Sequence, residues 1–403
     1  MNEWHTDKWF TSNWNFAQEV RRGIHFKDGI KIHDVTLRDG EQQAGLVLTC
    51  DQKIALAEKM AELGIHRIEA GMPAVSAEDA RAVSGIVKRG LPAEIFGFAR
   101  CMVDDVKRAA DCGVSGIVIE IPSNEQMIRE AYGWSLEKAV ELSVKATKAA
   151  QEAGLYTVFF PIDMTRANID WVLKLIGRVA ADGHMDALAV VDTMGGLAPH
   201  TVPYLIDTIK SRIDKPLEVH FHDDFGLGVA NSIMGLAAGA DVVHTTISAC
   251  GERAGNAAYE HLALALLTMY GYDLGLDYSK IYSLSKLLRS FIDLPVRGNM
   301  GVIGDRVFDI ESGIVAGWYK NVKNTNPLLV TPYLPELTGH PGTEVVLGKH
   351  SGGPSIDCWA DRLHIKLDKE QKSDLLGQIK LAACKKGNTL DEQEVRLLFK
   401  QYQ

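Results

Sequence analysis

The sequence lacks the features of a secreted or membrane-spanning protein. It has only six cysteines in 403 residues, and no two form a CxxC pair, so neither a disulfide framework nor a zinc knuckle is expected. No window approaches 18 consecutive apolar residues, which excludes a predicted transmembrane helix. The N-terminal MNEWHTDKWFTSNWNF lacks the charged-then-apolar order of a signal peptide. We therefore expect a soluble, cytoplasmic protein from a reducing compartment.

Long runs of one charge are also missing. The chain carries 43 Lys and Arg against 52 Asp and Glu, a formal charge of −9, and no extended basic stretch. Neither a nucleic acid nor a membrane surface is therefore an expected partner. Because the overall field is acidic, an anionic ligand must be held by a few individually placed cations.

What the sequence does contain is a regular alternation of strand-like and helix-like segments. Helical spacing is seen in the first intervening segment at Ile54, Ala57 and Met60. The eight short apolar runs that we interpret as strands are 30–37, 66–71, 94–98, 116–121, 155–162, 186–192, 217–222 and 241–247. Eight strand–helix repeats in about 240 residues predict an α/β fold of the (β/α)₈ TIM-barrel type. A doubly wound sheet is the alternative, but the GxGxxG turn expected after its first strand is absent.

The alternation ends near residue 275, which predicts three regions. We expect an N-terminal extension at 1–29, a catalytic barrel at 30–275, and a small, mostly helical C-terminal module at 276–403. Within this module, 367–400 has the spacing of a helical tail.

Polar residues at the ends of two predicted strands suggest a metal site. In a TIM barrel the carboxyl ends of all strands face a common site. His220 and His222 lie two residues apart on the seventh strand and therefore point to the same side, and Asp39 follows the first strand. Two histidines and a carboxylate with open positions suit a divalent metal that also takes substrate oxygens. The alternative is that both histidines make polar contacts in the core.

Other strand ends supply candidate substrate contacts. Arg38 can bind a carboxylate or stabilise an enolate, or it can form a salt bridge at the barrel mouth. Thr193 can donate its hydroxyl to a carboxylate, or cap the following helix. Glu69 and Arg100 end the second and third strands, where a mutual ion pair is the simpler interpretation.

Two glycine-rich loops add further candidates. The loop 251–256 follows the last strand, and its Asn256 can reach a metal or a metal-bound water. The loop 347–353 contains Lys349 and either holds a phosphate or turns a corner.

Three segments together resemble a known family. DVTLRDGEQ (34–42), HFHDDFGLGVAN (220–231) and GERAGN (251–256) are similar to motifs of the 2-isopropylmalate, homocitrate and citramalate synthases. That family belongs to a superfamily of metal-dependent barrels that includes HMG-CoA lyase. The resemblance covers roughly residues 30–360, and the GERAGN loop is closer to the synthase branch than to the lyase branch.

The resemblance implies an acyltransferase that condenses an acyl-CoA, first of all acetyl-CoA, with a 2-oxo acid to give a 2-alkylmalate-type product. A divalent metal (Mn²⁺, Mg²⁺ or Zn²⁺) is implied on Asp39, His220 and His222, with Asn256 nearby. The residues implied to contact substrate are Arg38, Gln42, Glu69, Arg100 and Thr193, and those implied in catalysis are Arg38 and Tyr333. A homodimer is also implied, since the family's C-terminal module reaches a neighbouring subunit's site.

The sequence departs from this family where protons are transferred. Ile162 stands where the family has an acid/base glutamate, with Phe160 in place of a serine. Val158 replaces the arginine that homocitrate synthases use for a distal carboxylate, and Val315 replaces a histidine that enters the neighbouring site. Tyr333 loosely matches a tyrosine that works with this histidine. Homocitrate synthesis is therefore the least favoured activity within the family.

These departures leave several possibilities open. A different residue supplies the base, and the candidates are Asp163, Tyr333, His350 and His244. Alternatively, the reaction has changed to retro-Claisen or retro-aldol cleavage by a lyase on the same scaffold. The third possibility is a metal-binding barrel that has lost catalysis.

Overall fold

The computed structural model describes residues 2–402 and divides the chain into two compact units. One unit is Asn13–Val296, and the other combines Met1–Ser12 with Arg297–Gln403. The barrel unit therefore extends about twenty residues beyond the predicted boundary at 275. It includes α10 (Ile281–Phe291), a helix that the sequence analysis assigned to the C-terminal module.

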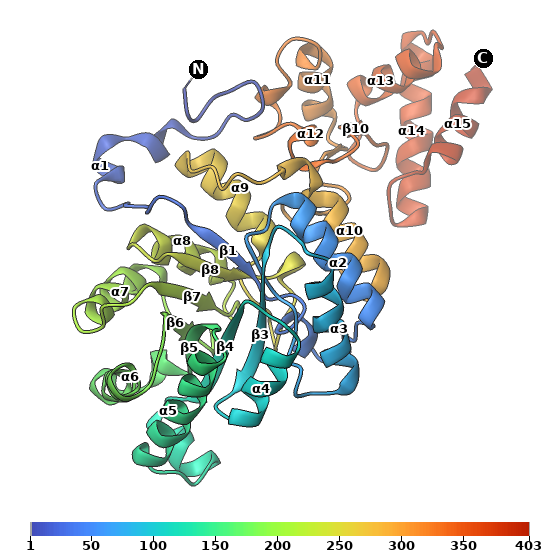
Figure 1. The fold of residues 1–403 in the computed structure, drawn as a ribbon. Coiled ribbons are helices and arrows are strands. Elements are labelled where there is room, and N and C mark those ends of the chain that lie inside the picture. Colours follow the sequence, from blue (N-terminus) through green and yellow to red (C-terminus); the bar gives the residue numbers. More distant parts are fainter. Residues whose placement is uncertain (1, 403) are drawn as a thin grey trace. The chain divides into compact units, whose positions relative to one another are not determined.

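The larger unit is a closed barrel of eight parallel strands in sequence order, which confirms the predicted (β/α)₈ fold (Figure 1). The strands are β1 (Lys31–Asp34), β2 (Arg67–Glu69), β3 (Glu94–Arg100), β4 (Gly116–Pro122), β5 (Tyr156–Ile162), β6 (Ala187–Asp192), β7 (Leu217–Phe221) and β8 (Val242–Thr245). The barrel closes where β1 pairs with β8, with His33 opposite His244.

Helices of this unit alternate with the strands and surround the barrel. Besides α10, they are α1 (Gln18–Arg21), α2 (Cys50–Leu63), α3 (Ala77–Lys88), α4 (Val103–Asp111), α5 (Leu136–Glu152), α6 (Ile169–Asp182), α7 (Val202–Lys210), α8 (Gly228–Ala237) and α9 (Tyr259–Tyr270). Helix α2 shows how the sequence sets their limits. Thr49 caps its first turn by accepting a hydrogen bond from the amide of Gln52, and Gly64 ends it at a φ of 102°.

The first strand is shorter than the predicted run 30–37. After Asp34 the chain turns, and the carbonyl of Val35 accepts hydrogen bonds from the amides of Arg38, Asp39 and Gly40. This turn replaces the ladder bonds that a longer strand would make. It places Arg38 and Asp39 at the carboxyl end of the barrel instead of along its wall.

The interior of the barrel has two halves of different chemistry. The apolar half is contributed by β3–β6 and consists of Phe96, Phe98, Val118, Val158, Phe160, Ala187, Ala189 and Val191. The polar half comes from β1, β2, β7 and β8 and consists of His33, Arg67, Glu69, Glu218, His220 and His244, all of them buried. Polar groups this deep require internal partners, which they find mainly in one another.

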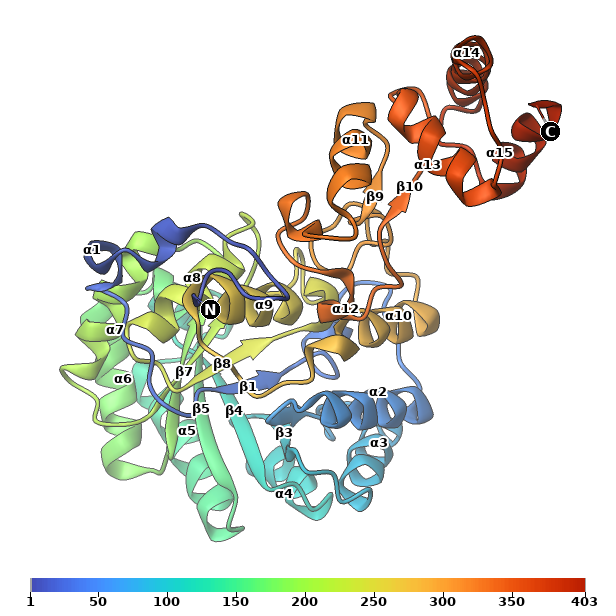
Figure 2. The ribbon, with the colours of Figure 1, turned by 90° about the horizontal axis from the view of Figure 1, so that it is seen from above.

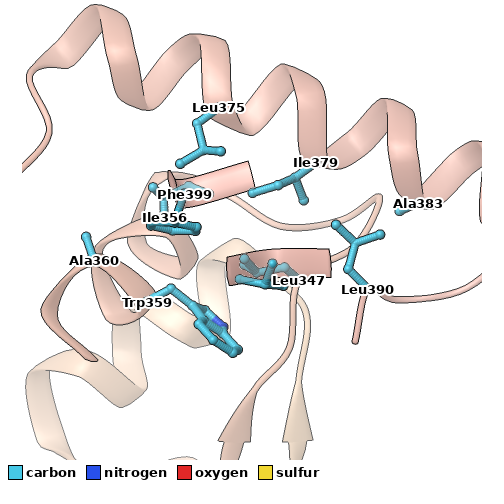
Figure 3. Close-up of a cluster of buried hydrophobic side chains, with 10 residues drawn as sticks. Leu347, Ile356, Trp359, Ala360, Leu375, Ile379, Ala383, Leu390 and Phe399 are labelled. Carbon is cyan, nitrogen blue, oxygen red and sulfur yellow. The ribbon is translucent and has the colours of Figure 1, made fainter. Parts of the chain in front are cut away.

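The smaller unit has its own hydrophobic core (Figure 3). Its elements are β9 (Asp309–Ile310), α11 (Gly313–Val322), α12 (Pro335–Thr338), β10 (Glu344–Val345), α13 (Gly353–Leu363), α14 (Lys369–Lys386) and α15 (Glu392–Phe399). Leu347, Ile379 and Phe399 lie in the core, where Trp359 also donates its indole N–H to the carbonyl of Val345 at 2.6 Å. Figure 2 views the same ribbon from above. Across residues 2–402, no helix combines the length and apolarity needed to cross a bilayer.

Candidate active site

Asp39, His220 and His222 converge at the carboxyl end of the polar half. The Nε2 atoms of the two histidines are 3.3 Å apart. The Oδ2 atom of Asp39 lies 3.5 Å from Nε2 of His220 and 4.0 Å from Nε2 of His222. All three residues are at most 5% exposed, and their ligand atoms lie within 4.8 Å of one another. The structure thus brings together the three residues that the sequence analysis selected for a metal.

The electrostatics of this cluster suit a cation. Burial lowers the pKa of His220 to about 3, so its imidazole is neutral. Burial alone would raise the pKa of Asp39, but Arg38 and the two histidines outweigh it and hold this pKa well below its usual range. Neutral imidazoles and an ionised carboxylate are the protonation states in which these groups bind metal ions.

Asn256 completes the cluster through the loop after β8. Its Nδ2 donates to Oδ1 of Asp39 at 3.0 Å, while its buried Oδ1 has no hydrogen-bond partner in the described chain. Gly251 permits this approach, because a Cβ there would lie 2.3 Å from Nδ2 of Asn256. A buried amide oxygen beside two imidazoles and a carboxylate is a suitable further ligand for a divalent metal. The donor set therefore fits such an ion.

A buried chain of contacts orients the His220 ring from behind. Nδ1 of His220 lies 3.2 Å from Nδ1 of His244, whose Nε2 lies 2.8 Å from Oε2 of Glu218. The other oxygen of Glu218 accepts from Arg67 at 2.7 Å. Partners of this kind fix the ring orientation and tautomer of a ligating histidine. Since His244 is held on both ring nitrogens, it is not the free base that the sequence analysis considered.

Arg38 lies beside the metal ligands and retains an unused donor. Its Nη1 donates to Asp39 at 2.7 Å and lies 3.4 Å from Oε1 of Gln42, while its Nε contacts Glu69. Its guanidinium also stacks 4.0 Å above the ring of Phe98. The buried Nη2 has no hydrogen-bond partner among residues 2–402. Arg38 is thus positioned for one more anionic or carbonyl oxygen.

The simpler interpretation of Glu69 and Arg100 as a mutual ion pair is wrong. Glu69 is paired with Arg38, whereas Arg100 forms two hydrogen bonds with Asp105, at 2.7 and 3.2 Å. The two side chains diverge because Glu69 faces the polar half, while Arg100 sits half-exposed at the end of β3.

Thr193 and Asp163 lie together at the ends of β6 and β5. The Thr193 hydroxyl accepts a hydrogen bond from the amide of Asp163 at 2.8 Å and does not cap the next helix. Its own hydrogen is left to donate. The buried Asp163 carboxylate is bound by Arg166 at 2.7 and 2.8 Å and by Asn124 at 3.1 Å, so it too is unsuited as a free base.

The remaining candidates belong to the smaller unit. Tyr333 packs its ring edge-on against Phe308, with the centroids 5.6 Å apart, and burial raises its pKa. In the loop 347–353, the amide of His350 donates to the carboxylate of Glu311 at 3.0 Å, so the amide bonds a protein carboxylate there. The catalytic role of Tyr333 stays a prediction.

Glu120 on β4 is a polar residue that faces the apolar half and was not among the candidates predicted from the sequence. In the segment GIVIEIP it follows the inward-facing Val118 by two residues, so both side chains point to the same face of the strand. This spacing was the available signal. It was masked because the whole segment resembles an ordinary buried strand.

The fold is a (β/α)₈ barrel with a side-chain cluster suited to a divalent metal at its carboxyl end, and comparison with known proteins identifies its family. The model of the HMGL-like family matches residues 29–288. A homocitrate synthase from Methanothermobacter thermautotrophicus is 35% identical over 373 residues, which are 93% of both chains. A 2-isopropylmalate synthase from Methanocaldococcus jannaschii is 35% identical over 94% of this chain and 73% of its own length.

Among solved structures, an HMG-CoA lyase from Bacillus subtilis superimposes with a TM-score of 0.61 and 20% identity, covering 67% of this chain and 96% of that one. This likeness supports the fold alone. The chain belongs to the HMGL-like family, and its close relatives are synthases of the acyltransferase type. The resemblance seen in the three sequence motifs is thereby confirmed.

Proposed function

We propose that this protein condenses an acyl-CoA with a 2-oxo acid, in the cytoplasm, at the cluster around Asp39. The observation that carries this proposal is the unused Nη2 donor of Arg38 beside three converging metal-ligating side chains. Such an arrangement offers a cation and a hydrogen-bond donor to the same developing negative charge.

Asp39, His220 and His222 would hold the divalent ion, with the amide oxygen of Asn256 as a further donor. When bound, a divalent ion of the Mn²⁺, Mg²⁺ or Zn²⁺ type polarises the ketone of the 2-oxo acid. The rest of the site then has to orient the two substrates and move a proton.

The side chains around the metal ligands divide this work. Arg38 donates its free N–H to an oxygen that becomes negative as the new carbon–carbon bond forms. Thr193 donates its hydroxyl to the carboxylate of the 2-oxo acid. Gln42, Glu69 and Arg100 border the same mouth, where Glu69 holds the Arg38 guanidinium in place.

The apolar half supports a 2-oxo acid with an apolar side chain. Val158 and Phe160 face the barrel interior, and Ile162 packs against the same cluster. The Phe160 ring meets the His220 ring at a centroid distance of 4.9 Å, close to the metal ligands. A second carboxylate on the substrate would find no cation from β5 at this wall. We expect pyruvate or 2-oxoisovalerate to be used in preference to 2-oxoglutarate.

The test is thiol release from acetyl-CoA by the metal-loaded protein, across 2-oxo acids from pyruvate through 2-oxoisovalerate to 2-oxoglutarate. Turnover with a small apolar 2-oxo acid supports the proposal. Silence across the panel, together with release of acetyl-CoA or pyruvate from 3-hydroxy acyl compounds or 2-hydroxy acids, would contradict it and favour a lyase.

We also propose a homodimer, as the resemblance in the three sequence motifs implies. Light scattering at micromolar concentration checks this, and a monomer there would contradict it.

A further inference from the structure

Glu120 places a carboxylate on the apolar wall opposite the metal ligands. It lies in β4 in register with Arg100 of β3 and Phe160 of β5. Because it follows Val118 by two residues, its side chain points to the same face, the barrel interior. The register pairs Ile162 with Pro122, so Glu120 lies one strand across and one inward-facing position deeper than Ile162.

Glu120 is free of the pairing that occupies its neighbours. In residues 2–402, no hydrogen bond or ion pair joins its side chain to another residue, and it is partly buried. The other inward carboxylates are engaged: Asp39 with Arg38, Glu69 with Arg38, and Glu218 with Arg67 and His244. Glu120 therefore keeps both oxygens available for a ligand or a proton.

Burial and the nearby charges together bring the pKa of Glu120 close to neutral pH. Burial raises its pKa to about 7. The cations Arg38 and Arg100 oppose this rise, while the carboxylates Asp39 and Glu69 add to it. A carboxyl group with a pKa near the working pH is suited to both accepting and returning a proton.

We propose that Glu120 is the general base that removes the α-proton of the acyl-CoA. This inference rests on the proposed function, and it assigns to β4 the proton transfer that Ile162 on β5 cannot perform. Two of the four alternative bases considered from the sequence, Asp163 and His244, are held by partners within the barrel unit and are not free to accept this proton. The other two, Tyr333 and His350, belong to the smaller unit.

The step balances without a further reactant. The C–H bond of the acyl methyl group breaks, its proton goes to a Glu120 oxygen, and its electron pair forms the bond to the ketone carbon. The π electrons of the ketone move to its oxygen, near the free N–H of Arg38. The protonated Glu120 then returns the proton to that oxygen, directly or through water, which restores the carboxylate and leaves a 2-alkylmalyl-CoA thioester. Water then hydrolyses the thioester C–S bond, giving the free acid and CoA, whose thiol the assay measures.

The experiment compares the wild type with Glu120→Gln, Glu120→Asp and the control Glu152→Gln, which changes an exposed carboxylate at the end of α5. Two rates are measured on metal-loaded protein with the 2-oxo acid panel present. One is thiol release from acetyl-CoA, and the other is exchange of the acetyl methyl protons in D₂O, followed by mass spectrometry. Metal content is measured for every variant.

We expect Glu120→Gln to lower both rates by about 10²–10⁴-fold at unchanged metal content, with Glu120→Asp in between. The control should match the wild type. Thiol release and exchange that stay within a few-fold of wild type in Glu120→Gln would overturn the assignment, and so would loss of metal from this variant.

The two proposals fail in different ways. Wild-type exchange without thiol release would contradict condensation, while loss of this exchange in Glu120→Gln would still support Glu120 as the base. Wild-type thiol release that survives in Glu120→Gln would leave the condensation standing and remove Glu120 from it. A wild type with neither rate would overturn both.

Discussion

The two halves of the barrel interior differ in what they contribute to one site. In the polar half, buried imidazoles, carboxylates and Arg67 bond to one another and hold His220 in one orientation. In the apolar half, aromatic and aliphatic side chains pack against one another, and Phe98 and Phe160 also contact Arg38 and His220 through their rings. Glu120 adds a carboxylate to this wall. The polar half therefore holds the charged groups and His220 in fixed positions. The apolar half excludes water and forms the wall that we expect to contact the substrate.

This difference explains which family features the chain keeps. Metal ligation depends on the polar half, where each member leaves another buried group unpaired if it is lost. The wall of the apolar half tolerates exchange between residues of similar volume, since its packing is not directional. Substrate choice can therefore change on β4 and β5 while His220 on β7, and His222 just after it, remain.

Among the changes predicted here, Arg38→Ala should have the largest effect, because it should lower activity without removing the metal. We expect kcat to fall by about 10²–10³-fold, because one donor to the developing negative charge is lost. Metal content by elemental analysis should stay at the wild-type level, and Arg178→Ala, on the exposed face of α6, serves as the control. A kcat near the wild-type value would show that Arg38 is only a salt bridge at the barrel mouth.

Glu218→Gln probes the polar half through stability. The change leaves Arg67 and His244 without a buried anion and should lower the free energy of unfolding of the metal-free protein by about 3 kcal/mol at pH 7. Burial tends to raise the pKa of Glu218, but His244, His33 and Arg67 lower it overall. The stabilisation is thus present above the unfolded pKa and is lost as the pH falls through the folded value.

Urea unfolding at pH 7 and pH 4 measures this effect. The penalty of Glu218→Gln should shrink at the lower pH. An equal penalty at both values would mean that the carboxylate charge does not stabilise the polar half.

Val158→Ala makes the matching change in the apolar half. Loss of two buried methyl groups should cost about 2 kcal/mol, from transfer and cavity terms together. This penalty should be the same at pH 7 and pH 4, with metal content unchanged. If the loss of unfolding free energy in Val158→Ala changed with pH, the two halves would not differ in the way proposed, since an apolar side chain has no charge to titrate.

Glu120→Gln should give the smallest change in the free energy of unfolding, and with the opposite sign. Because burial raises the folded pKa of Glu120 above its unfolded value, its ionisation opposes folding as the pH rises from the unfolded value past about 7. Partial exposure screens this effect, so we expect a stabilisation on the order of 1 kcal/mol at pH 8 and almost none at pH 4. Destabilisation at pH 8 would assign Glu120 a structural role in place of a catalytic one.

The sequence was sufficient for the barrel and for the convergence of Asp39, His220 and His222, for identifiable physical reasons. Strand and helix periods are local properties, and the spacing of His220 and His222 fixes their common face. Pairing partners were not predictable, because Glu69 and Arg100 choose their partners through the barrel's three-dimensional register. Glu120 was not predicted because the environment of one polar residue within an apolar strand depends on neighbours that only the folded barrel brings together.

The most direct test of this account is the metal content of His222→Ala after dialysis against Mn²⁺ or Zn²⁺, with the exposed His200→Ala as the control. The account predicts one equivalent of metal in the wild type and in the control, and none in His222→Ala. Equal metal in all three proteins would contradict a metal centre on Asp39, His220 and His222.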